Sequence, residues 1–172
     1  MRNSLVLFAA LMLAAPAAAL SQTTKPLDDA TIVAIFDHAN TVDIETGKLA
    51  MEKGASVKVR DFGKMIAGDH AAVRQLGRDL ASKLGVTPTP PAGDAATKSQ
   101  AATMQKLRGL SGKAFDRAFL QHEVEFHAGV INAVNTTLLP AIQNAELKAL
   151  VVKVAPAFLG HQKAAEALLR DY

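Results

Sequence analysis

The sequence contains no cysteine and no tryptophan, and it has one tyrosine among its 172 residues. The absence of cysteine excludes disulfides, zinc sites built on thiolates and catalysis by a thiol. Neither sign of charge dominates: 19 basic and 16 acidic side chains give a net charge of +3, which provides no reason to expect a nucleic-acid partner. With 49% apolar and 20% charged residues, the composition is that of a globular protein, and it excludes disorder, collagen and a multi-pass membrane protein.

A long hydrophobic run stands near the N-terminus. It extends from Leu5 to Ala15, follows a positive charge at Arg2, and is interrupted by Pro16 and then three small residues. This is the pattern of a secretory signal peptide, and the run is shorter than the roughly 20 apolar residues that a membrane span needs. The pattern predicts a cleaved signal peptide over residues 1–19 and a single domain over residues 20–172, in the periplasm or outside the cell.

Apolar side chains recur every three or four residues from Asp28 onward, which predicts helices throughout the rest of the chain. Glycine and proline breaks divide this stretch into five predicted helices, at about residues 28–53, 55–84, 97–110, 113–139 and 144–169. Residues 86–96 contain three prolines and are expected to form the one long connection, while Pro156 predicts a kink within the last helix. Four long amphipathic helices predict an all-α fold, an up-down four-helix bundle with an extra short helix after the Pro-rich loop.

Several histidines and glutamates occupy positions where the helical stripes should be apolar. Glu123 and His127 lie four residues apart in the buried arc of their helix, so their side chains point the same way. His161 falls in the middle of the stripe of the last helix, and His70 and Glu45 lie on the flanks of theirs. A buried carboxylate or imidazole is costly unless it is paired, hydrogen-bonded or coordinated, so these five residues are expected to meet at one level of the bundle.

Imidazole and carboxylate are ligands that zinc, copper, iron and manganese accept in proteins. The residues Glu45, His70, Glu123, His127 and His161 therefore predict an interior metal site. Two alternatives stay open. The five residues can form a proton-sharing network of hydrogen bonds without a metal, or they can be unrelated polar positions that are each satisfied locally.

Short motifs also recur along the chain in a specific order and spacing. They are the run Asp43–Ala50 (DIETGKLA); then Val57, Lys58, Phe62, Met65, Asp69 and His70; then Phe115–Phe119 with His127; and then Pro156 with His161. Through them the chain, from about Pro26 to Leu169, resembles a ferritin-like family of exported bacterial proteins catalogued as domain of unknown function 4142. Some members carry an outer-membrane label. The resemblance implies a bundle of the ferritin superfamily and peripheral association with the cell envelope, but no established activity.

The chain departs from the metal pattern of di-iron bundles, which use glutamates from two helices and a Glu-x-x-His pair from each of the other two. Glu123 and His127 are one residue too far apart for such a pair, and Ala67 stands where His70 would need its glutamate. With two carboxylates instead of four, oxidative di-iron chemistry is not expected. A single ion held by imidazoles fits better, which favours zinc or copper over iron.

Other signals of function are weak. No phosphate-binding loop or nucleophile elbow is present in the sequence, so an enzyme is not the leading expectation, although a histidine acting as general base stays open. Asp116, in the first turn of its helix, is expected only to favour the helix dipole. The sequence thus predicts an exported protein that binds a transition metal, in metal handling or a stress response. The alternative is a non-catalytic envelope protein whose cluster is a buried network with a structural or interaction role.

Overall fold

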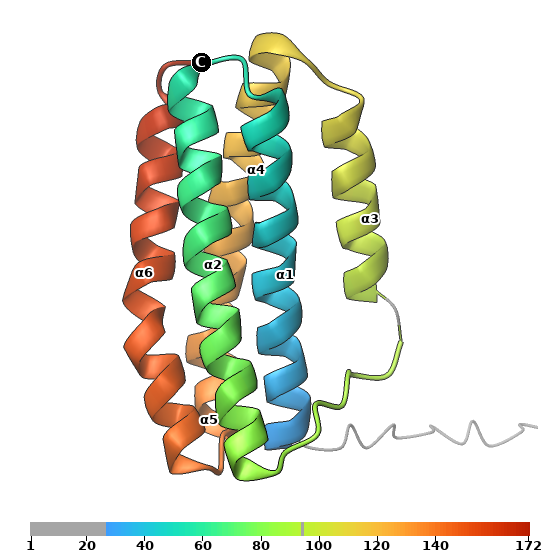
Figure 1. Cartoon of the computed structure of the whole chain (residues 1–172), viewed down its shortest axis with the longest axis vertical. Coiled ribbons are helices and arrows are strands. Elements are labelled where there is room, and N and C mark those ends of the chain that lie inside the picture. Colours follow the sequence, from blue (N-terminus) through green and yellow to red (C-terminus); the bar gives the residue numbers. More distant parts are fainter. Residues whose placement is uncertain (1–26, 94) are drawn as a thin grey trace, which may run out of the picture.

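The computed structural model describes residues 27–93 and 95–172, and every regular element within them is helical (Figure 1). The predicted signal peptide, residues 1–19, lies outside these residues. The four long helices are α1 (Asp29–Lys53), α2 (Val57–Leu84), α4 (Gly112–Ala133) and α6 (Ala145–Leu169). The prediction of an all-α fold is confirmed. None of the helices in the described part of the chain is long and apolar enough to cross a membrane.

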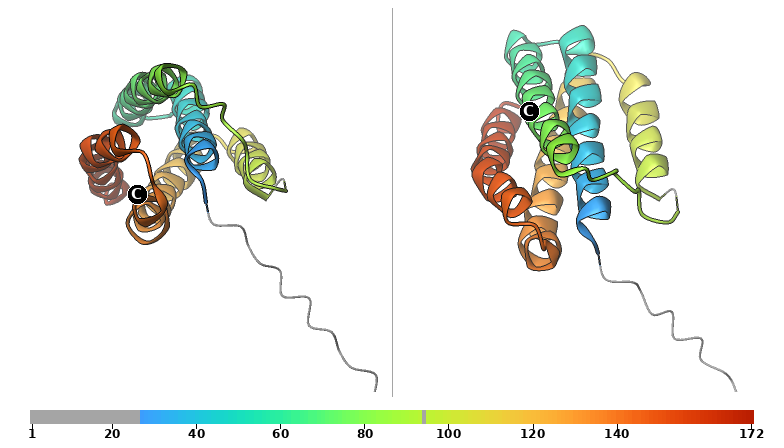
Figure 2. Two further views of the ribbon diagram at one scale, coloured as in Figure 1. Left: turned by 90° about the horizontal axis from the view of Figure 1, so that it is seen from below. Right: turned by 60° about the horizontal axis from the view of Figure 1, so that its bottom comes forward.

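The bundle consists of two helical hairpins packed side by side. Helices α1 and α2 form the first hairpin and α4 and α6 the second; α2 packs beside α6, and α1 beside α4 (Figures 1 and 2). The long connection after α2 contains α3 (Ala95–Arg108) and leads back along the bundle, so α2 and α4 run in the same direction. Helix α3 lies outside the bundle, beside the upper half of α1 in Figure 1, and buries Met104 and Leu107.

Polar side chains begin three of the four long helices. The Asp28 side chain accepts a hydrogen bond from the Thr31 amide at 2.9 Å, and Ser56 accepts one from the Val59 amide at 3.1 Å. Asn144 accepts from the first amides of α6 in the same way. These bonds satisfy amides that have no partner within the helix, which is why the helices begin at these residues.

The third long helix differs from the prediction, which had it α-helical as far as Leu139. The α-helix ends at Ala133 and is followed by a π-helical segment, η1 (Val134–Leu138), and one further turn, α5 (Leu139–Ala141). The Leu139 amide donates to the carbonyl of Val134, five residues back. Pro140 is the physical reason, because it has no amide hydrogen and its ring crowds the preceding turn, so the wider π turn replaces the last α turn.

Asp116 also differs from the expectation that it would only favour the helix dipole. It is fully buried, and its carboxylate accepts hydrogen bonds from the amides of Ala55 at 2.7 Å and Ser56 at 2.9 Å. The hydroxyl of Tyr172 donates to the same carboxylate at 2.7 Å. Asp116 therefore ties the turn between α1 and α2 to the C-terminal residue.

The hydrophobic core is divided into two clusters along the bundle axis. The upper cluster in Figure 1 includes Leu49, Ala50, Val59, Phe62, Ile66, Phe115, Phe119 and Leu120. The lower cluster includes Ile32, Val33, Ala81, Leu138, Ile142, Leu147 and Val151. Between the two clusters, all four long helices place polar side chains in the interior. This polar layer is where the sequence predicted the site.

Candidate metal centre

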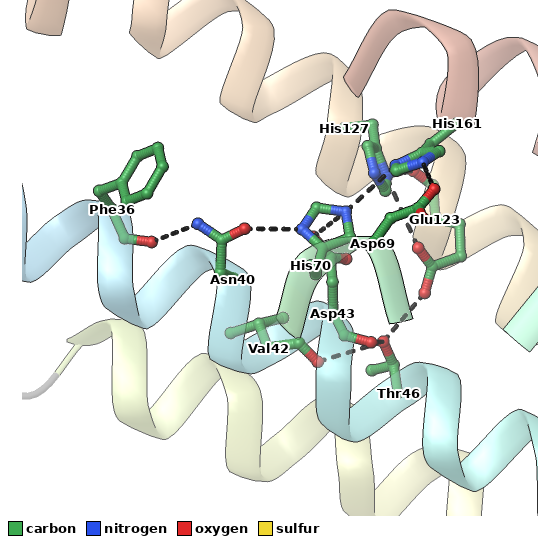
Figure 3. A network of polar contacts seen from close by, with 10 residues as sticks. All are labelled: Phe36, Asn40, Val42, Asp43, Thr46, Asp69, His70, Glu123, His127 and His161. Atoms are coloured by element: carbon green, nitrogen blue, oxygen red, sulfur yellow. Dashed lines mark hydrogen bonds and ion pairs between the residues drawn. The ribbon is translucent and has the colours of Figure 1, made fainter. Parts of the chain in front are cut away.

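The polar layer is built from every long helix of the bundle. Its members are Asn40, Asp43 and Thr46 from α1, His70 from α2, Glu123 and His127 from α4, and His161 from α6 (Figure 3). His161 is the most exposed of them, at 6% of its surface. Since these groups are shielded from water, their contacts with one another determine their protonation and what they can bind.

Asn40 determines which nitrogen of His70 carries a hydrogen. The amide nitrogen of Asn40 donates to the carbonyl of Phe36 at 2.8 Å, which turns its oxygen toward His70. This Oδ1 lies 2.9 Å from Nδ1 of His70, so Nδ1 carries the hydrogen and donates it. The other nitrogen, Nε2, is left with a lone pair that points into the bundle.

His127 and His161 are held in the same manner. Nδ1 of His127 lies 2.9 Å from the backbone carbonyl of Glu123 and can only donate to it. Its Nε2 is buried and has no hydrogen-bond partner among the described residues. Nε2 of His161 lies 3.0 Å from Oδ2 of Asp69 and donates to this carboxylate. The free lone pairs are therefore those of His127 Nε2 and His161 Nδ1.

The three imidazoles converge. Nε2 of His70 lies 3.2 Å from Nδ1 of His161, and His127 offers a nitrogen so that the three ligand atoms lie within 4.8 Å of one another. Two nitrogen lone pairs at such a distance repel unless a proton or a cation lies between them. An imidazole with one N–H held by an oxygen and the other nitrogen free is how proteins orient histidine toward a metal. The three histidines could therefore hold one metal ion between them.

Two carboxyl groups adjoin the imidazoles. Oδ2 of Asp43 lies 3.3 Å from Nε2 of His70, and Glu123 and Asp43 each offer an oxygen within 4.8 Å of a nitrogen of His127. Thr46 donates to Oε1 of Glu123 at 3.0 Å. Within the described chain, no N–H or hydroxyl group donates to Oε2 of Glu123 or to either carboxyl oxygen of Asp43. The two carboxyl groups lie close enough to hydrogen-bond to each other when one of them is protonated. Once both are ionised, these buried oxygens fit a cation, because coordination would satisfy them.

The electrostatics follow from burial. Burial raises the pKa of Glu123 to about 8, and burial together with the neighbouring Glu123 raises the pKa of Asp43 well above its ordinary value. Burial also lowers the pKa of His70 to about 3 and that of His127 to about 4, helped by the other imidazoles of the cluster. His70 and His127 are therefore neutral at pH 7, which is the form that coordinates a metal, and Glu123 holds a proton that a bound cation would displace.

The structure brings together four of the five predicted site residues: His70, Glu123, His127 and His161. Glu45 is not part of the cluster. It is exposed, and it accepts a hydrogen bond from Gln100 of α3 at 3.0 Å. Asp43 takes its place. Residues two apart on a helix point in nearly opposite directions, so one of these two acids had to face outward.

A signal for Asp43 was present in the sequence. Asn40, Asp43 and Thr46 follow one another at intervals of three residues, and Gly47 comes four residues after Asp43, which places all four near one helical face. Glu45 lies outside this series. Glu45 was predicted because it lies on the flank of the apolar stripe, whereas Asn40, Asp43 and Thr46 lie within that stripe. In the structure, Asn40, Asp43 and Thr46 are all fully buried.

The family model described as domain of unknown function (DUF4142) matches residues 13–168. The chain belongs to the DUF4142 family. The resemblance to domain of unknown function 4142 is thereby confirmed. The DUF4142 chain is similar in fold to the crystal structure of a DUF305 fragment from Deinococcus radiodurans, with a TM-score of 0.73 and 16% identity. The match covers 86% of this chain and 100% of that chain, and at this identity it shows the fold alone. No curated protein shows significant similarity to the DUF4142 chain.

Proposed function

We propose that this DUF4142 protein binds one transition-metal ion in its polar layer. The ligands are His70, His127 and His161, and the carboxyl groups of Asp43 and Glu123 complete the coordination. The observation that carries the proposal is the orientation of the three rings: each commits one nitrogen to an oxygen of the protein and turns the other toward its neighbours. Bringing the free nitrogens of three buried imidazoles together is unfavourable unless a proton or a cation lies between them.

Charge balance favours a divalent ion. Two carboxylates neutralise the charge of such an ion, so the occupied site would carry no net charge in the low-dielectric interior, where an uncompensated charge is strongly unfavourable. Nitrogen-rich ligation suits zinc and copper, and iron is a weaker candidate. The proposed role is metal handling or a response to metal or oxidative stress in the cell envelope. The predicted signal peptide supports the location.

We infer also that the bundle is ferritin-like. What supports this is the single long connection, which contains α3 and leads back along the bundle so that α2 and α4 run parallel. A four-helix bundle with one long crossover is the ferritin-like arrangement. The proposed ligand set nevertheless differs from that of di-iron bundles, since Asp43 and Glu123 are the only carboxyl groups among the proposed ligands.

The test is the metal content of protein purified without an affinity tag. We expect about one equivalent of zinc or copper per chain, and a loss of that metal in the double variant His127→Ala/His161→Ala. His38→Ala is the matched control, because His38 lies on α1 outside the cluster and should leave the metal content unchanged. Stripping the unsubstituted protein with a chelator and titrating metal back makes the result independent of how the variants fold. Failure of the stripped protein to take up an equivalent of any transition metal would overturn the proposal.

A second candidate function rests on the protonated carboxyl groups. A protonated Asp43 could donate to Nε2 of His70, 3.3 Å away, and so satisfy part of the cluster without a metal. The protein would then be a non-catalytic envelope protein whose cluster is a buried network with a structural role. The two functions differ in their response to a chelator. Because a ligand that binds only the folded state stabilises it, EDTA should lower the melting temperature of a metal protein and leave that of a metal-free network unchanged.

A further inference from the structure

The lower half of the bundle contains an apolar cavity of about 440 Å³. Its walls come from α1, the end of α4, η1 and α6, and they reach as far as Asn40 and Phe158 in the polar layer. Helix α3 lies beside the upper half of α1 in Figure 1 and contributes no residue to these walls. The volume falls within the range of roughly 300–1,000 Å³ that is typical of small-molecule pockets.

The lining determines what could occupy this cavity. It contains no Asp, Glu, Lys, Arg or His, and its polar side chains are two asparagines, Asn40 and Asn135. Both ends of the Asn40 amide are already engaged, by Phe36 and His70. Val152 and Leu159, which also line the cavity, are 54% and 43% exposed, so an apolar path leads to solvent. A charged group inside would have no partner, whereas an uncharged apolar molecule would lose only its contact with water.

Two irregular helices shape the cavity. The π-helical segment contributes Val134, Asn135 and Leu138, and α6 contributes Pro156. Pro156 cannot donate the hydrogen bond that the carbonyl of Val152 would receive in a regular helix. A π segment is a costly feature that often accompanies a functional site. Here the two departures from regular helix geometry both line the same cavity.

The cavity adjoins the candidate metal centre through Phe158. The ring of Phe158 is edge-on to His70, with ring centroids 5.0 Å apart, and its centroid lies 5.9 Å from that of His127. Asn40 lines the cavity and holds Nδ1 of His70. A molecule in the cavity would therefore contact two residues that position the metal-binding rings.

We propose that this cavity binds an uncharged apolar small molecule next to the metal centre. Binding itself needs only the cavity, whereas a role for that molecule in the chemistry of the centre rests on the proposed metal function. Any polar head group of the ligand would remain at the mouth near Val152 and Leu159. The apolar part would extend along α1 and η1 toward Phe158.

The test uses N-phenyl-1-naphthylamine, an uncharged probe whose fluorescence rises in apolar surroundings. We expect saturable binding of one probe per chain, and at least tenfold weaker binding of the sulfonated analogue, 8-anilino-1-naphthalenesulfonate. Ala155→Phe, which fills the cavity, should weaken probe binding at least tenfold. Ala157→Phe is the matched control, since Ala157 is exposed on the same helix, does not line the cavity and should leave binding within twofold.

Val152→Asp provides a second variant that does not depend on repacking the interior, because Val152 is largely exposed at the mouth. It should also weaken probe binding. Non-saturable binding, or equal loss in the Ala155 and Ala157 variants, would overturn the inference. Measuring chelator-stripped and metal-loaded protein side by side separates the two proposals. Probe binding without metal uptake would uphold the cavity and overturn the metal centre, and metal uptake without probe binding would do the reverse.

Discussion

His70 of α2 and His161 of the neighbouring α6 approach each other with Nε2 and Nδ1 only 3.2 Å apart, and both rings have their other nitrogen committed to an oxygen. The partner of His70 is the buried Asn40, whereas that of His161 is Asp69, a largely exposed carboxylate on α2. Neither ring can turn its N–H toward the other without losing that bond. The pair is therefore preorganised to share a proton or to bind a cation.

Asp69 should influence the metal site without contributing a ligand. We expect Asp69→Asn to weaken metal affinity about 10- to 100-fold, because the hydrogen bond that orients His161 and strengthens its ligand nitrogen is weakened. Thermal stability of the metal-free protein should change little, since Asp69 is 55% exposed. Competition with a chromophoric chelator measures the affinity. Asp61→Asn, on an exposed position of the same helix, is the control, and equal affinities in both variants would contradict the role assigned to Asp69.

The histidines should make the folded state sensitive to acid. His70 and His127 have folded-state pKa values of about 3 and about 4, below the ordinary value of about 6.5. Between these values the unfolded chain binds more protons than the folded chain, so the stability present above pH 6.5 is lost as the pH falls toward 4. Urea unfolding of chelator-treated protein at pH 4.5 and 6 measures the difference in an Asp43→Asn/Glu123→Gln variant, because the raised pKa values of these two carboxyl groups change stability in the opposite direction over this range. A midpoint of this variant that did not decrease at the lower pH would show that the imidazoles are not shielded from water.

Glu123 gives the folded state the opposite pH dependence, because its contribution to stability decreases as the pH rises. Its folded-state pKa of about 8 exceeds that of the unfolded chain, so its contribution is present below about pH 4.5 and is lost as the pH rises toward 8. Metal-free protein should therefore lose about 1–2 kcal/mol between pH 6.5 and 8. A bound ion keeps the carboxylates ionised and removes this loss. Urea unfolding at pH 6.5 and 8, once with EDTA and once with zinc, tests whether a bound ion removes this loss. An equal loss of stability with EDTA and with zinc would contradict the prediction.

The contact between α1 and α2 depends on glycine. A Cβ atom on Gly63 would lie 2.7 Å from the carbonyl oxygen of Gly47, so Gly63→Ala must push the helices apart. We expect it to destabilise the fold by about 2–3 kcal/mol. Gly68 is the control, because a Cβ there meets nothing within 4 Å, and Gly68→Ala should stabilise α2 by up to about 1 kcal/mol. Urea unfolding of both variants measures these changes, and equal effects would contradict the close contact.

Asp116 should matter for stability and not for metal binding. Asp116→Ala removes a buried carboxylate and leaves the amides of Ala55 and Ser56 without their acceptor, and we expect a loss of about 3 kcal/mol. Tyr172→Phe removes the contacts of the tyrosine hydroxyl with Asp116 and Ser56 but keeps both amide bonds to Asp116, and it should cost about 1 kcal/mol. Thermal unfolding together with metal analysis checks both variants. A loss of metal in Tyr172→Phe would contradict the separation of the two sites.

Most of the fold could be predicted from the sequence, because apolar residues at helical spacing and breaks at glycine and proline are local signals. They located the long helices to within a few residues. The π segment before Pro140 was missed, since a proline predicts the end of an α-helix but not which wider turn replaces it. Four of the five site residues were also predicted, because a histidine or glutamate within an apolar stripe must be satisfied by a neighbour.

The sequence by itself determined that this chain forms four amphipathic helices with ionisable groups turned inward, since both properties depend on spacing along one helix. Only the tertiary structure decided that Asp43 and not Glu45 faces the histidines. That choice depends on how far α1 is rotated toward its neighbours, and the close approach of Gly47 and Gly63 limits this rotation. The direction of the three imidazole lone pairs was likewise decided by oxygens from other turns and other helices. The direction of a free lone pair depends on the hydrogen bond made by the other nitrogen of the same ring. Residue spacing alone cannot specify the partner in that bond.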